Sequence, residues 1–130
     1  MSSSTLATRV RREPGEIAVI TVTGEVDIAT VAGLRDRLFT LADTSRSVIV
    51  DLDQVSFIDA AGLGALVGAA RRADIHGASL QVVCDRPRTR ELIRLAGLDH
   101  RLRLARTRAE ALQALRMTAD PQPRSGEAAM

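Results

Sequence analysis

The stretch from Val48 to Ile75 constrains the fold most, because it combines a strand pattern, a turn and a helix pattern in direct succession. It opens with a β-branched run, Val48 to Val50, which is typical of a strand buried on both faces. A second apolar run covers Val55 to Ile58. Beyond Asp59 the larger apolar residues recur at helical spacing, at Leu63, Leu66, Val67 and Ala70. The sequence therefore predicts a strand–turn–helix unit in the middle of the chain.

Asp59 is predicted to cap this helix. Its carboxylate can accept hydrogen bonds from the backbone amides of Ala61 or Gly62, which have no partner within the helix. The first turns contain only small residues apart from Leu63, namely Ala60, Ala61, Gly62, Gly64 and Ala65. Glycine inside a helix costs about 0.5–1 kcal/mol relative to alanine. We therefore expect a close approach at this helix, either to the sheet beneath it or to a partner above it.

Other apolar patterns predict the remaining elements. Strands are expected at Thr5 to Val10, Ile17 to Val22, Leu80 to Cys84 and Leu102 to Leu104. Helices are expected at Val31 to Leu41, Pro87 to Leu95 and Arg106 to Met117. Pro14-Gly15 suits a turn between the first two strands, and the segment from Gly24 is expected to break the second strand. His76-Gly77 is expected to end the central helix.

Three segments resemble the STAS domain of bacterial anti-sigma factor antagonists. Phe57 to Gly64, with the sequence FIDAAGLG, is similar to a signature of Asp, a phosphorylatable Ser or Thr, a small or hydroxyl residue, and Gly-Leu-Gly. Thr23 to Thr30 resembles the Gly-Glu-Leu-Asp segment before the first helix. Leu95 to Leu104 resembles the Gly-Leu turn before the last strand. The resemblance runs from Leu6 to Met117 in the family's order.

The resemblance implies a single small α/β domain over residues 1–117. Its mixed sheet would have about five strands, with about four helices mainly on one face. The Pro- and Gly-containing tail, 118–130, is expected to be disordered. The implied function is that of a non-enzymatic antagonist, which binds an anti-sigma factor of the serine kinase type with an ATPase fold and so releases a sigma factor.

The resemblance also implies a partner-binding edge at the start of the central helix. It would consist of Asp59, Ala60, Ala61, Gly62, Leu63 and Gly64, with Asp27 as a second contact. For Asp27, local capping of the preceding loop is an equally good interpretation. Small side chains at such an edge allow the backbone of a partner to approach closely, and a short apolar patch rimmed by acids suits a transient interface.

The chain departs from the family at the phosphoacceptor, because Ala60 stands where the family has a hydroxyl residue and Ala61 follows it. A phosphate adds a charge of about −1.5 to −2 and bulk to a contact face. An antagonist that lacks this acceptor is expected to bind its partner constitutively. Ser56 is the nearest alternative hydroxyl, but it lies roughly 13 Å of extended chain away.

Composition agrees with one ordinary globular domain. The chain has 130 residues, 45% of them hydrophobic, and it has no apolar stretch of membrane-spanning length or secretory leader, so we expect a cytoplasmic protein without membrane contact. The computed pI of about 9.8 exceeds what the net charge of +2 suggests, since every basic residue is Arg. The segment from Arg86 to Arg108 is rich in Arg but has no aromatic residue. We interpret its charges as protection of an edge strand, with an electrostatic patch for a phosphate-bearing ligand or RNA as the competing interpretation, and we expect no direct DNA binding.

The residues offer little for chemistry, so we expect neither an enzyme nor a cofactor. The glycines of the central helix lack the spacing and the lysine of a phosphate-binding loop. Asp51, Asp53 and Asp59 can in principle hold Mg²⁺, but loop acids and one helix cap are the preferred interpretation, so no metal is expected. Cys84 is expected to be a small buried hydrophobe.

A second hypothesis also fits the sequence. The alternative is a STAS-like scaffold, or a small-ligand or nucleotide-sensing module, outside a sigma-factor pathway. In either case we expect a monomer or a weak dimer.

Overall fold

The computed structural model describes residues 5–118. The chain order of the elements is β1 (Leu6–Glu13), β2 (Ile17–Val26), α1 (Val31–Thr44), β3 (Ser47–Ile58), α2 (Ala60–Ile75), β4 (Ser79–Val83), α3 (Pro87–Leu95), β5 (Arg103–Ala105) and α4 (Arg108–Thr118). Thr118 ends α4, and the remainder of the predicted tail lies outside the described residues.

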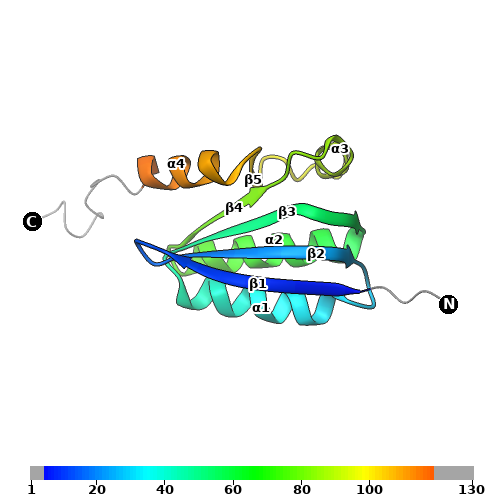
Figure 1. The fold of residues 1–130 in the computed structure, drawn as a ribbon, viewed down its shortest axis with the longest axis horizontal. Coiled ribbons are helices and arrows are strands. Elements are labelled where there is room, and N and C mark those ends of the chain that lie inside the picture. Colours follow the sequence, from blue (N-terminus) through cyan, green and yellow to red (C-terminus); the bar gives the residue numbers. More distant parts are fainter. Residues whose placement is uncertain (1–4, 119–130) are drawn as a thin grey trace, which may run out of the picture.

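The strands form one sheet in the order β1-β2-β3-β4-β5 (Figure 1). β1 pairs antiparallel with β2, whereas the pairs β2–β3, β3–β4 and β4–β5 are parallel. The parallel pairs require crossover connections, which α1, α2 and α3 supply. This arrangement confirms the predicted mixed five-stranded sheet with four helices.

The two faces of the sheet carry separate apolar clusters. One cluster joins α1, α2 and Ile93 of α3 to one face, with Ile20, Val50 and Leu66 fully buried. On the other face α4 places Ala111 and Leu115 in a smaller cluster with residues of β2, β3 and β4. The helices therefore lie mainly on one face, as the sequence indicated.

The prediction that β2 stops before Gly24 was wrong, since the strand continues to Val26. Gly24 has a φ of +112°, and a Cβ added to it would lie 2.2 Å from the carbonyl oxygen of Thr5. The glycine thus lets the backbone at Thr5, beside β2, approach closely, instead of ending the strand. The interpretation of Asp51 and Asp53 as loop acids was also wrong, because the apolar runs on either side of them form one continuous strand, β3, in which Asp51 is buried and hydrogen-bonded to Arg108.

The helix ends follow the sequence signals closely. His76 is the C-cap of α2 and Gly77 follows with a φ of +71°, while Pro87 begins α3. The His76 Nε2 atom lies 3.0 Å from Asp43 Oδ1 on α1. Arg72 donates two hydrogen bonds to the same carboxylate, and these bonds lower the pKa of Asp43. These contacts join α1 to α2 at the surface.

None of the helices within residues 5–118 combines the length and the apolar character that crossing a membrane requires.

Candidate functional site

The N-terminus of α2 is held in place by Asp59. Its Oδ1 atom accepts hydrogen bonds from the backbone amides of Ala61 at 2.9 Å and Gly62 at 3.1 Å, as predicted for an N-cap. The backbone amide of Asp59 in turn donates to the carbonyl of Val26 at 3.1 Å. The cap therefore ties the start of α2 to the end of β2, and it fixes the direction in which the first turn points.

The small residues after the cap serve different purposes. Ala60 and Gly64 are exposed, Ala61 is half-buried, and Gly62 and Leu63 are buried. A Cβ on Gly62 would lie 2.6 Å from Ile58 Cγ1 and 2.7 Å from Val26 Cγ1, whereas a Cβ on Gly64 would meet nothing within 4 Å. Gly62 thus lets the helix approach the sheet, and Gly64 leaves the outer surface open.

Asp27 lies beside Asp59 at the same end of the sheet. Val26 and Ile58 are register partners in the parallel pair β2–β3, so the two aspartates directly follow neighbouring strands. The Asp27 Oδ1 atom accepts hydrogen bonds from the amides of Ala29 and Thr30 at 2.9 and 3.2 Å. Asp27 therefore orders the loop before α1, which was one of its two interpretations.

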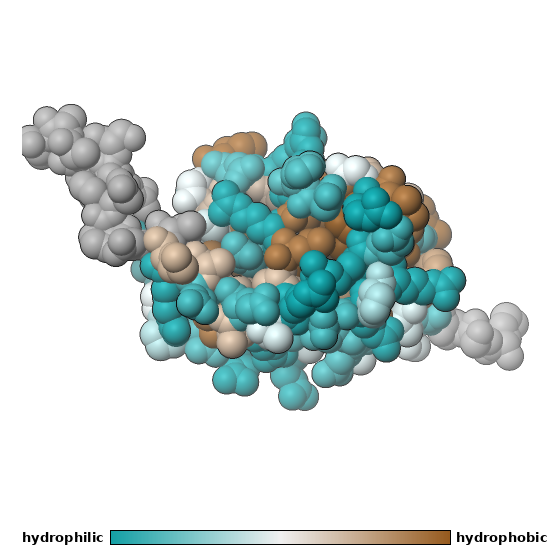
Figure 2. Space-filling model, turned by 90° about the horizontal axis from the view of Figure 1, so that it is seen from above, coloured by the Kyte–Doolittle hydropathy of each residue, from teal (hydrophilic) through white to brown (hydrophobic). Residues whose placement is uncertain are grey.

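An apolar groove of about 850 Å³ separates the start of α2 from α3. Its walls include Phe57, Leu92 and Leu95, whose exposed fractions are 50%, 37% and 70%. Figure 2 shows apolar residues gathered at the end of the molecule where Figure 1 places α3. Ala60 and Leu63 line the same groove, so the predicted edge is one wall of a larger depression.

The residues of α3 were missed by the sequence prediction. Leu92 and Leu95 lie more than 25 positions from Leu63 in the chain, and only the packing of α3 brings them next to it. Phe57 carried a usable signal, since it is one of two Phe in the chain and is placed directly before the cap. Large aromatic side chains are common in protein interfaces.

The groove has a mixed polar rim. Asp59, Arg88 and Glu91 line it, and Glu91 is paired with Arg94, which lowers the pKa of the Glu91 carboxyl. Apolar walls with a charged rim are typical of a surface that another protein covers. Of the two positions considered for phosphorylation, Ala60 carries a methyl group, and the Ser56 hydroxyl donates to the carbonyl of Gly24 at 3.3 Å.

The carboxylates of the three acidic residues considered as metal ligands each accept hydrogen bonds from other groups. Asp51 accepts one hydrogen bond from Arg108 and one from the backbone amide of Asp53, and the Asp53 carboxylate accepts one from the amide of Asp85 at 2.7 Å. Asp59 is the helix cap. Across residues 5–118, no three acidic, His or Cys side chains are placed to hold a metal ion.

Comparison with known proteins identifies relatives of this chain. The STAS domain profile matches residues 8–111. The anti-sigma-F factor antagonist RsfB of Mycobacterium tuberculosis is 32% identical over 101 residues, which cover 77% of this chain and 82% of RsfB. The crystal structure of an anti-sigma factor antagonist from Mycobacterium paratuberculosis superposes with a TM-score of 0.79 at 31% identity, covering 86% of this chain and 95% of that one.

A more distant structure supports the fold alone. The unphosphorylated form of the anti-sigma factor antagonist SpoIIAA superposes with a TM-score of 0.72 at 24% identity. The match covers 85% of this chain and 97% of SpoIIAA. The five-stranded sheet and its helices are therefore the arrangement that these proteins share.

Proposed function

This chain belongs to the STAS domain family, and from that membership we propose that it is an anti-sigma factor antagonist. It would bind an anti-sigma factor in the cytoplasm and so release a sigma factor, without acting as an enzyme. The observation that carries the proposal is the open apolar groove beside the N-terminus of α2. Asp59, Ala60 and Gly64 would form one side of the contact, with α3 on the other and Asp27 at the edge.

The proposed partner is an anti-sigma factor of the serine kinase type with an ATPase fold. Ala60 gives such a kinase no oxygen to phosphorylate at the first position of α2. A phosphate there would place about two negative charges beside Asp59 and at the rim of an apolar surface. Because Ala60 cannot acquire that charge, the antagonist would remain able to bind its partner.

The binding site can be tested with one charged substitution and a matched control. Leu95→Asp puts a charge into the groove, whereas Ile75→Asp puts the same charge on a similarly exposed apolar residue at the far end of α2. Calorimetry with the anti-sigma factor encoded in the same genome should show at least tenfold weaker binding for Leu95→Asp only. Equal binding by both variants and the unmodified protein would place the contact elsewhere.

The missing acceptor can be tested by mass spectrometry. Incubated with the anti-sigma kinase and ATP, the unmodified protein should keep its intact mass, while Ala60→Ser should gain one phosphate. Ser56→Ala in the Ala60→Ser protein serves as control and should leave that gain unchanged. Phosphate on the unmodified protein would contradict constitutive binding, and its position would identify the true acceptor.

A further inference from the structure

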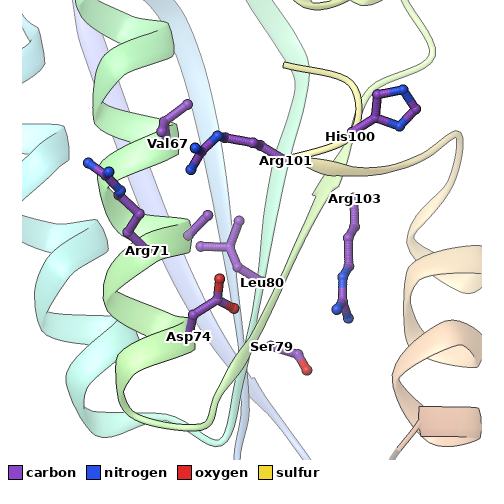
Figure 3. Close-up of a pocket in the computed structure, with 9 residues that line it drawn as sticks. Val67, Arg71, Asp74, Ser79, Leu80, His100, Arg101 and Arg103 are labelled. Carbon is purple, nitrogen blue, oxygen red and sulfur yellow. The ribbon is translucent and has the colours of Figure 1, made fainter. Parts of the chain in front are cut away.

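A second pocket of about 270 Å³ lies at the other end of α2, between that helix and the edge formed by β4 and β5. Figure 3 shows Asp74 on α2 pointing into this hollow and Arg101 reaching toward the helix from the segment before β5, whereas the side chain of Arg71, which also lines the pocket, runs along the outer side of α2. Arg103 extends along β4 toward the level of Ser79. The pocket lies on the second half of α2, away from the groove at its start.

The pocket exists because β5 is short. β5 pairs only with Gln81, Val82 and Val83, so Ser79 and Leu80 at the start of β4 have no strand beside them on that edge. Buried Leu80 forms part of the floor, and the turn before β5 crosses above it. Arginines from two separate parts of the chain thereby border one concavity.

The cations of this pocket are not neutralised by neighbouring side chains. Within residues 5–118, the guanidinium groups of Arg71, Arg101 and Arg103 make no hydrogen bond or ion pair with another side chain. By contrast, Arg72 pairs with Asp43. Asp74 is the only carboxylate among the lining residues, so the pocket has a net positive charge.

Protection of an edge strand explains only part of this arrangement. Charged side chains on β5 and the residues before it hinder pairing with another sheet, which accounts for Arg101 and Arg103. It does not account for Arg71, which belongs to a helix and borders the same hollow. An anion held in the hollow would have an arginine of the helix and two arginines of the sheet edge at its border.

We propose that this pocket binds a small phosphate ester that carries hydroxyl groups, such as a sugar phosphate. Guanidinium groups match phosphate oxygens in charge and geometry, and a phosphate monoester carries close to two charges at neutral pH. Asp74 and the Ser79 hydroxyl can accept hydrogen bonds from the hydroxyl groups of the ligand. Among the lining residues, only His100 carries a ring on which a nucleic-acid base can stack, and the pocket has no Phe, Tyr or Trp.

The test is an amide NMR titration of the whole chain with ribose 5-phosphate at low ionic strength. We expect saturable shifts at the amides of Arg71, Ser79 and Arg101. Arg71→Gln and Arg101→Gln should each weaken binding about tenfold or more, because each removes charge-assisted hydrogen bonds to phosphate. Arg35→Gln is the matched control, because Arg35 is an exposed arginine on α1, outside the pocket, and it should leave the affinity unchanged.

Parallel titrations with sulfate, inorganic phosphate and ribose identify what is recognised. Ribose should not bind, and the ester should bind more tightly than either inorganic ion. Equal affinity for sulfate and for the ester would mean an adventitious ion only. Tighter binding of single-stranded RNA would mean that the pocket is part of a polymer site. Either result overturns the proposal, and so does the absence of localised amide shifts. The assay contains no anti-sigma factor, so its result is independent of the function proposed above.

Discussion

Arg108 and Asp51 are joined across 57 positions of sequence. Arg108 Nε lies 2.5 Å from Asp51 Oδ2, and an Arg108 terminal nitrogen donates to Thr21 Oγ1 at 2.6 Å. The Asp51 side chain is only 9% exposed. The first residue of α4 is therefore fixed to β2 and β3 by a carboxylate that water barely reaches.

Replacing Arg108 with Met should destabilise the protein by about 2–3 kcal/mol, because the Asp51 carboxylate would lose its charged partner while staying largely buried. Urea unfolding followed by far-UV circular dichroism measures the change.

Arg106→Met is the matched control for this substitution. Arg106 pairs with Asp85 at 3.0 Å, but both side chains are 60% exposed. Exposed pairs contribute little, so the cost should stay below about 1 kcal/mol. If both variants lost the same free energy of unfolding, burial of Asp51 would not be what makes the Arg108–Asp51 pair stabilising.

The sequence predicted Asp59 but not the Arg108–Asp51 pair, for a physical reason. A helix cap binds amides two and three residues ahead, so its partners are present in the local sequence. The ion pair depends on how α4 packs against the sheet. No local pattern distinguishes Arg108 from the other arginines in its segment.

Two glycines in the first turns of helix α2, Gly62 and Gly64, differ in what lies beside them. At Gly62 an added methyl group would meet Ile58 and Val26, whereas at Gly64 it would enter open space. We therefore predict that Gly62→Ala destabilises the fold by about 1–3 kcal/mol. Gly64→Ala should stabilise it by about 0.5–1 kcal/mol through the helix propensity of alanine. Thermal unfolding followed by circular dichroism measures both changes.

A gain in stability by Gly62→Ala would contradict the close packing of α2 on the sheet. Gly64→Ala has a further use, since it adds one methyl group to the proposed partner-binding edge without disturbing the fold. Weaker binding of the anti-sigma factor by this more stable variant would separate docking from folding.

At the level of elements, every helix and strand was predicted in the correct order, and the errors concern strand ends and the expected loop at Asp51 and Asp53, which lie inside β3. Gly24 was interpreted as a strand break, because glycine is usually unfavourable in strands. Its role depends on Thr5, whose backbone crosses close to it. Such a contact between strands leaves no signal in the local pattern.

The molecule as a whole should unfold in one step, since β3 shares apolar clusters with helices on both faces of the sheet. The chain has no Trp or Tyr, so Cys84 is a convenient probe. Its side chain is fully buried, and burial raises the pKa of the thiol, which keeps it protonated and unreactive in the fold. In urea, the rise in thiol reactivity should coincide with the loss of circular dichroism.

A thiol that reacts at lower urea concentrations would contradict the single transition. It would indicate that the part of the molecule around β4 and α3 opens before the remainder.

The apolar groove between α2 and α3 is also formed by the molecule as a whole. Of the edge that the resemblance implies, Ala60 and Gly64 are exposed whereas Gly62 and Leu63 are buried, and a local motif contains only one wall of a depression. The other wall comes from α3, and its position depends on the packing of Ile93 in the core.

The order of the strands across the sheet repeats their order along the chain. A polypeptide leaving the ribosome can therefore lay down the β1–β2 hairpin first and then extend one growing edge. No later strand has to be inserted between two earlier ones. Synthesis and sheet assembly can proceed in the same direction. This shortens the time during which the edge of an incomplete sheet is exposed without a paired strand.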